Sequence, residues 1–265
     1  MPITRKLDLV VFEHEVDRVL PLREAGVCDF MVDMERRGKA RRQLGADTEI
    51  GHASLSDVRK LARVERIKVH CRVNAWSART RSEVEKAIGE GSHRIYLPMV
   101  QRREQAEAFL EAVDSRVETA ILIETQTAAQ DPTQFADLPL DAVFVGLNDL
   151  AISRGSSSIF SAVSDGTVEN IRNGLSKPQF GFGGITCIDL GYPIPCRLIM
   201  AYLAAVGGSY SFLRRSFKRD IMGRDLPLEI TRIHELWDQL LSRDPAQISV
   251  DNASLDEAIR RLDGK

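Results

Sequence analysis

The sequence predicts one α/β domain built as a closed (β/α)8 barrel, the TIM-barrel fold. Its length of 265 residues is typical of such barrels. Segments with strand-like and helix-like patterns alternate along the chain, which calls for a parallel sheet. Several strand segments are continuous apolar runs, as expected of strands covered on both faces. We expect a single domain over residues 1–265, with the barrel at about 7–241 and a tail at 245–265.

Each strand is predicted from a short apolar or alternating run. These runs lie at residues 7–12, 29–32, 67–73, 94–98, 119–124, 142–145, 179–183 and 209–213. Amphipathic helices are predicted between them, at residues 16–25, 55–64, 83–90, 104–113, 195–206 and 228–241. Capping signals support three boundaries: Ser54 before the second helix, Gly91 after the third, and Pro195 in the first turn of the fifth.

The C-terminal part of the chain allows two arrangements. The apolar face of residues 228–241 could close the barrel or dock on a neighbouring subunit. In the tail, we predict a short extra helix over residues 254–262.

Composition narrows the class of protein. A formal net charge of −2 gives no general attraction to nucleic acid or to an anionic membrane. No run approaches the roughly 18 apolar residues of a membrane span. The four cysteines, Cys28, Cys71, Cys187 and Cys196, lie far apart without CxxC spacing, which indicates buried thiols in a reducing compartment. We therefore expect a cytoplasmic protein without a nucleic-acid or membrane partner.

Two neighbouring strands end in carboxylates. Glu124 follows the apolar run at 119–123, and Asp149 follows the run at 142–145. Active sites of such barrels lie at the carboxyl ends of the strands, and a buried acid is costly unless its charge is compensated. We predict that Glu124 and Asp149 hold Mg²⁺, or Mn²⁺ or Co²⁺ in its place. The alternative is that they form ion pairs at the rim or cap the following helices.

Other charged residues converge on the same rim. Arg72, at the end of the third strand, is predicted to bind a substrate carboxylate; its alternative role is an internal salt bridge. Arg214 and Arg215, with Lys218 and Arg219, are expected as a salt-bridged rim or subunit contact rather than a catalytic group. A metal ion beside arginines suits a small anionic substrate such as a keto acid.

Five short motifs together resemble one family, the HpcH/HpaI aldolase and citrate lyase β-subunit family of pyruvate- and phosphoenolpyruvate-utilising barrels. They are Val-Asp-Met-Glu at 32–35, Arg-Val-Asn at 72–74, Leu-Pro-Met-Val at 97–100, Ile-Glu-Thr at 123–125 and Phe-Val-Gly-Leu-Asn-Asp-Leu at 144–150. The resemblance covers about residues 25–155 and extends more loosely to about 220.

This resemblance implies a divalent-metal-dependent carbon–carbon lyase that acts on a small 2-keto acid, with an aldehyde partner, through a pyruvate-like enolate. It makes Glu124 and Asp149 the metal ligands, and Asp33 and Glu35 catalytic residues that order a metal-bound water. Substrate contacts are expected from Arg72, Gln43, Gly146, Leu147 and Asn148, with the backbone amide of Gly146 facing the substrate carboxylate. It also implies a homo-oligomer, a trimer or hexamer that exchanges the last barrel helix.

The sequence departs from the family pattern at one position. Arg36 stands where aldolases of the family carry a histidine for proton transfer. His52 is the predicted substitute, with a solvent-facing or capping role as its alternative; His14 and His70 are poorer candidates. Glu35 acting through a metal-bound hydroxide would need no histidine.

The loop at residues 36–43 leaves other functions open. It puts five cations among eight residues, which could receive a phosphate, a coenzyme A tail or an acidic sugar, or could be a solvated loop paired with nearby acids. Alternative functions are therefore a coenzyme A thioester lyase or hydrolase, phosphoenolpyruvate-type chemistry at the same metal site, or a non-catalytic keto-acid-binding protein.

Overall fold

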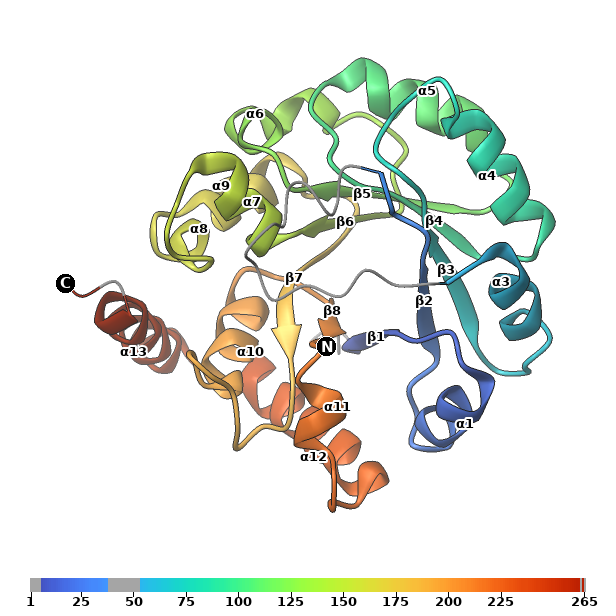
Figure 1. Ribbon diagram of the computed structural model, residues 1–265. Helices are drawn as coiled ribbons and strands as arrows, with labels where there is room; N and C mark the ends of the chain where they lie inside the picture. The colour runs from blue at the N-terminus through green and yellow to red at the C-terminus, as the bar shows by residue number, and fades with distance from the viewer. Residues whose placement is uncertain (1–5, 38–52, 263, 265) are drawn as a thin grey trace.

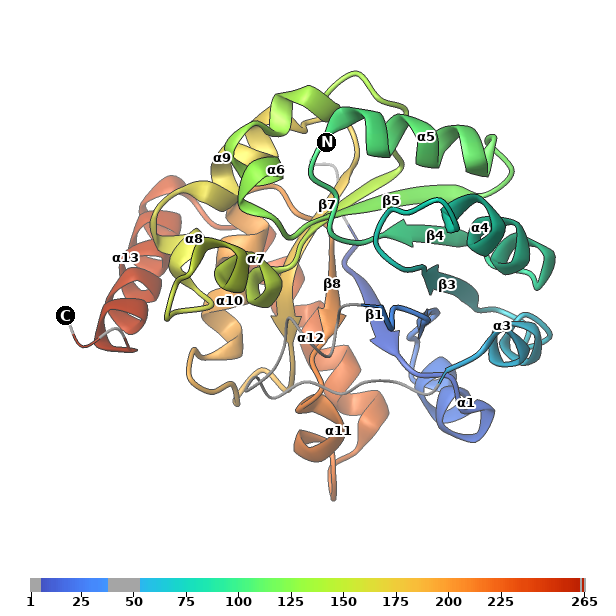
Figure 2. The same ribbon diagram turned by 45° about the horizontal axis from the view of Figure 1, so that its top comes forward.

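The computed structural model describes residues 6–37, 53–262 and 264. Within them, eight parallel strands pair in chain order, and the eighth closes onto the first (Figures 1 and 2). The strands are β1 (Asp8–Phe12), β2 (Asp29–Asp33), β3 (Lys68–Arg72), β4 (Arg94–Leu97), β5 (Glu118–Ile123), β6 (Ala142–Val145), β7 (Gln179–Ile185) and β8 (Tyr210–Leu213). The predicted (β/α)8 barrel is therefore confirmed.

Helices cover the outside of this barrel (Figure 1). They are α1 (Val16–Glu24), α3 (Leu55–Leu61), α4 (Thr80–Gly89), α5 (Arg103–Val113), α6 (Gln126–Gln130), α7 (Leu147–Arg154), α8 (Ser161–Ser164), α9 (Thr167–Gly174), α10 (Cys196–Ala205), α11 (Phe217–Asp220), α12 (Leu226–Leu241) and α13 (Pro245–Leu262), with a 3₁₀ turn at Pro132–Phe135. None of those described is long and apolar enough to cross a membrane.

The alternation of side chains along each strand separates two apolar cores. One core fills the layer between the sheet and the helices. The other lies inside the barrel and is formed by Val10, Met31, Tyr96, Ala120, Leu122, Ala142, Phe144, Tyr210 and Phe212. Because every second strand residue points inward, the residues just before and after this inner core line the two ends of the barrel.

The C-terminal helices pack on the barrel of their own chain. The amphipathic helix α12 contacts both α1 and α10, so it closes the ring of helices (Figure 1). The helix α13 lies outside α10 and starts nine residues earlier than the sequence analysis predicted. Its start is fixed by reciprocal bonds between the backbone amides and side chains of Asp244 and Gln247, a capping arrangement with Pro245 in the first turn.

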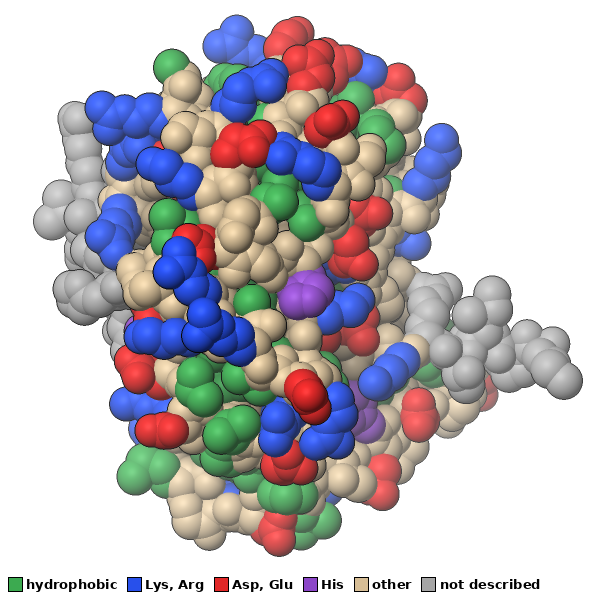
Figure 3. All heavy atoms as spheres, turned by 90° about the vertical axis from the view of Figure 1, so that its right-hand side faces the viewer, with side chains coloured by type: hydrophobic (Ala, Val, Ile, Leu, Met, Phe, Trp, Pro, Cys, Tyr) green, Lys and Arg blue, Asp and Glu red, His purple; other side chains and the backbone are tan. Residues whose placement is uncertain are grey.

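The outer helical face shows no large apolar patch in the view of Figure 3, where cations and anions are interspersed. Ion pairs between neighbouring helices account for part of this pattern. Arg59 of α3 pairs with Glu90 after α4, and Arg116 after α5 pairs with Glu85 of α4.

Candidate active site

The two predicted metal ligands follow neighbouring strands. Strands β5 and β6 pair with Ile123 opposite Val145, so Glu124 and Gly146 leave the sheet side by side. Glu124 continues the inward alternation of Ala120 and Leu122 and is 3% exposed. The chain then turns at Gly146 into α7, which places Asp149 in the first helical turn, where it is 8% exposed.

Close packing fixes the carboxylate of Glu124. Its Oε2 accepts a hydrogen bond of 3.2 Å from the backbone N–H of Met99. A Cβ atom at position 146 would lie only 2.5 Å from Oε1 of Glu124. A side chain at position 146 would therefore displace the glutamate, whose side chain passes directly against the backbone there.

The electrostatics of this pair fit a cation. Burial, and then the negative charge of Asp149, raise the pKa of Glu124 well above the usual range of a glutamate. The positive charge of Arg72 lowers that pKa only in part, and Glu35 raises it further. Two buried carboxylates whose mutual repulsion is incompletely offset are a favourable environment for a divalent ion.

The donor set is small but sufficient for magnesium. Among the described residues, no group of three or more His, Cys, Asp or Glu side chains is arranged to hold a metal. Mg²⁺ is commonly held by one or two carboxylates, and water and substrate oxygens complete its coordination. Glu124 and Asp149 thus fit a magnesium-type site that needs no third side chain.

Arg72 is held in an ion-pair network beside these acids. Its Nε and Nη2 donate to the two carboxylate oxygens of Asp33 at 2.9 and 2.7 Å, and Glu35 lies 3.6 Å from Nε. The guanidinium carbon is 5.1 Å from the centre of the Phe12 ring. The alternative role of Arg72 as a member of an internal salt bridge is confirmed. Asp33 takes one edge of the guanidinium, so a substrate carboxylate would meet the opposite edge.

One cavity of about 410 Å³ joins these groups at the carboxyl ends of the strands. Of the predicted site residues, it is lined by Asp33, Arg72, Glu124, Gly146, Leu147, Asn148 and Asp149. Glu35 does not line it; this buried side chain instead lies against Arg72. Two further predicted site residues, Gln43 and His52, lie outside the described residues, as does most of the basic loop.

The role predicted for the Gly146 amide is corrected by the structure. Its N–H donates to the carbonyl oxygen of Ile123 at 3.2 Å and so belongs to the strand pairing. The first backbone bond within α7 runs from Leu150 to Gly146. The amides of Leu147, Asn148 and Asp149 precede it, and these are the ones that a helix N-terminus presents to an anion.

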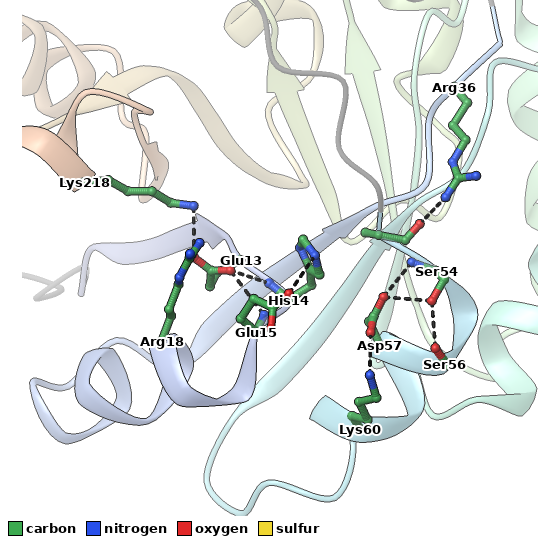
Figure 4. Close-up of polar contacts among 11 residues, drawn as sticks. Glu13, His14, Glu15, Arg18, Arg36, Ser54, Ser56, Asp57, Lys60 and Lys218 are labelled. Carbon is green, nitrogen blue, oxygen red and sulfur yellow. Dashed lines mark hydrogen bonds and ion pairs between the residues drawn. The ribbon is translucent and has the colours of Figure 1, made fainter.

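Arg36 and the histidines have distinct positions. The guanidinium of Arg36 donates to the carbonyl oxygen of Ala53 at 2.6 Å (Figure 4). The backbone N–H of Arg36 donates to Oδ1 of Asn74 at 2.9 Å. Arg36 does not line the cavity, whereas His14 does. His70 is fully buried and bonded to Asp29 at 2.8 Å, which confirms that it is a packed strand residue.

The β8 side of the cavity carries the cations that the sequence placed at the rim, but their pairing differs from the one expected. Arg214, Arg215 and Lys218 line it, although we expected a salt-bridged rim. That expectation holds for Lys218, which pairs with Glu13 at 2.9 Å. Within the described part of the chain, neither Arg214 nor Arg215 has a carboxylate oxygen within 4.0 Å.

The fold and the rim define a class: (β/α)8 barrels whose acidic and basic side chains meet at the carboxyl ends of the strands. Solved structures that share the fold include an HpcH/HpaI aldolase from Desulfitobacterium hafniense DCB-2, with 15% identity and a TM-score of 0.60 over 91% of this chain and 95% of that one. RipC from Yersinia pestis matches at 11% identity and a TM-score of 0.58, over 92% and 99% of the two chains.

A third structure, an HpcH/HpaI aldolase/citrate lyase family protein from Burkholderia cenocepacia J2315, matches at 13% identity and a TM-score of 0.58. It covers 91% of this chain and 97% of that one. At these identities the matches establish a shared fold. No protein-family model matches the chain, and a search of curated proteins finds no match either.

Proposed function

We propose that the protein is a divalent-metal-dependent carbon–carbon lyase of the HpcH/HpaI aldolase type, acting on a small 2-keto acid through a pyruvate-like enolate. The observation that carries this proposal is the buried pair Glu124 and Asp149 on the same cavity as Arg72. The fold shared with an HpcH/HpaI aldolase, together with the five sequence motifs, supports the same assignment.

The residues divide the work as follows. Glu124 and Asp149 would hold the ion. A bound divalent ion would polarise the keto oxygen and stabilise the negative charge of the enolate. Arg72 would bind and orient the substrate carboxylate, with Asp33 fixing the guanidinium plane through its two hydrogen bonds. Proton transfer is assigned to Glu35 acting through water, or to His52.

Metal binding and enolate formation can be tested without knowing the aldehyde partner. Binding of Mn²⁺ is measured by electron paramagnetic resonance, and exchange of the pyruvate methyl protons for deuterium is followed by NMR with Mg²⁺. We expect Glu124→Gln and Asp149→Asn to weaken Mn²⁺ binding about a hundredfold or more, because loss even of a group that only orients a ligand costs about 10- to 100-fold. Both variants should also lose the proton exchange.

A matched control is Asp137→Asn, which removes an exposed acid paired with Arg103 on the outer surface. It should bind Mn²⁺ and exchange pyruvate protons like the unmodified protein. Full metal-dependent exchange in either rim variant would refute the proposal.

A further inference from the structure

The cavity has a second polar wall, two strands beyond the acid pair in the barrel order. Arg214, Arg215 and Lys218 follow β8, whereas Glu124 and Asp149 follow β5 and β6. Arg214 is half-buried, and Arg215 and Lys218 are exposed. The three cations therefore face the same space as the proposed metal ligands, at a different part of its wall.

The backbone holds Arg214 firmly in this position. Its N–H donates to the carbonyl oxygen of Ile185 at 2.9 Å and so extends the pairing of β8 with β7. A Cβ atom on Gly184 would lie 3.0 Å from the Cβ of Arg214, so the glycine allows this close approach. Nη1 donates to the carbonyl oxygen of Tyr192 at 3.1 Å, while the buried Nε has no hydrogen-bond partner among the described residues.

The local charges leave this wall positive. Glu13 places a carboxylate on this wall of the cavity. This buried carboxylate is already paired with Lys218 at 2.9 Å and, at the longer distance of 3.9 Å, with Arg18 (Figure 4). The backbone N–H groups of His14 and Glu15 also donate to Glu13. The charges of Arg214 and Arg215 thus remain uncompensated by the described carboxylates.

We propose that Arg214 and Arg215, with Lys218, form an anion subsite that binds a carboxylate or phosphate group at the far end of the substrate. The proposed function defines the near end, where the keto acid lies between Arg72 and the acid pair. The identity of the substrate at this subsite rests on the proposed function. The affinity of the subsite for anions does not depend on that function. Paired guanidinium groups suit both oxyanions because their planar N–H donors match carboxylate and phosphate geometry.

The test compares three aldehydes in condensation with pyruvate and Mg²⁺: propanal, 4-oxobutanoate and glyceraldehyde 3-phosphate. Arg214→Gln and Arg215→Gln should raise the KM of a charged aldehyde about tenfold or more, the loss expected for hydrogen bonds to a charged group, and leave the KM of propanal unchanged. Whichever charged aldehyde shows the larger change identifies the group as carboxylate or phosphate. Arg219→Gln is the matched control, since this exposed cation of α11 pairs with Asp220 and does not line the cavity.

A second measurement separates this inference from the proposed function. Calorimetry measures the binding of inorganic phosphate and of succinate to the metal-free full chain and to its Arg215→Gln variant. Because Arg215 is exposed, its substitution should not disturb folding, so a loss of anion binding would reflect the loss of the guanidinium. If pyruvate exchanges no protons with Mg²⁺, but the variant loses phosphate or succinate binding, the lyase proposal fails and the subsite is supported. If pyruvate exchanges its protons while neither charged aldehyde responds to the substitutions, the subsite is overturned and the lyase proposal stands.

Discussion

The two ends of the barrel interior contain the same kinds of charged groups, but these groups are paired differently at each end. At the amino-terminal end, which we call the barrel floor, Arg94 of β4 donates to Glu118 of β5 at 2.7 Å and to Gln179 of β7 at 3.3 Å. At the carboxyl rim, Glu124 and Asp149 line one cavity. Glu118 begins β5 and Glu124 directly follows it, six residues later. Because this spacing is even, both side chains point to the same side of the strand, the inside of the barrel.

The pKa values of these two glutamates shift in opposite directions. Burial alone would raise the pKa of Glu118, but the charge and hydrogen bond of Arg94 outweigh it and lower the pKa. Burial raises the pKa of Glu124 too, and there the nearby Asp149 adds to the rise. The floor is thus internally neutralised, whereas the rim keeps charges that a ligand can compensate. This difference separates a stabilising polar layer from a functional one.

The largest effect should follow from breaking the floor. Arg94→Met leaves Glu118 and Gln179 without their shared donor, so we expect the free energy of unfolding to fall by about 2 to 3 kcal/mol. Loss of one partner of a buried pair costs about 3–5 kcal/mol, and the partial exposure of Glu118, 38%, reduces that figure. Urea unfolding measures the change, and Mn²⁺ binding should remain intact.

The control for the floor variant is Arg59→Met, which removes an exposed partner of Glu90 between two helices and should leave the unfolding curve in place. If Arg94→Met unfolded at the same urea concentration as the parent chain, the floor would have no stabilising role. If it lost Mn²⁺ binding, the floor and rim would not be separate units.

A smaller effect, now at the rim, is expected from Gly146→Ala. The new Cβ would come within 2.5 Å of Oε1 of Glu124, which must shift because the backbone cannot. We expect Mn²⁺ affinity to fall about tenfold and the free energy of unfolding to fall by about 1–3 kcal/mol, as for other overpacked sites. Gly89→Ala, in open space at the end of α4, is the control and should change neither quantity for the worse. Unaltered Mn²⁺ affinity in Gly146→Ala would show that Glu124 is not a ligand.

The fold could be predicted from the sequence because its signals are local and repeated. Apolar runs located all the strands of the barrel, with ends that differ from those of the structure by only a few residues. The missed helices, α6 to α9 and α11, have only four to eight residues each. They are therefore shorter than the roughly 11 to 18 residues over which a helical period is recognised in a sequence. In particular, Asp149 was predicted only to follow a strand, but Asn148 and Asp149 occupy the first turn of α7, where an acidic residue is favoured.

The candidate site could be predicted only where a strand end identifies its residues. Alternation along a strand locates Arg72 and Glu124 at the rim, and the structure lines one cavity with both. Spacing cannot say which of two available partners a charge will choose. Contacts between distant parts of the chain decide these pairings. Asp33 binds Arg72, and the carbonyl oxygen of Ala53 binds Arg36. Arg214 bonds to the carbonyl oxygen of Tyr192 instead of a carboxylate.

The last expected effect is a slope with pH, and it compares the two glutamates directly. In the metal-free protein, the folded state holds the proton of Glu124 more tightly than the unfolded chain, whose glutamate titrates near 4.5. Between about 4.5 and about 8, the folded protein therefore binds more protons than the unfolded chain. Its free energy of unfolding should fall as pH rises through this window, by on the order of 1 kcal/mol per pH unit, and Glu124→Gln should remove that slope.

Glu118→Gln should behave differently because the pKa of Glu118 is lowered. The stability that its charge contributes is present above about 4.5 and is lost only at lower pH. Urea unfolding at pH 5, 6.5 and 8 with a chelator should thus give parallel pH profiles for Glu118→Gln and the parent chain, and a flatter profile for Glu124→Gln. Equal slopes of unfolding free energy against pH for all three proteins would mean that burial does not raise the pKa of Glu124. The contrast between floor and rim would then have no electrostatic basis.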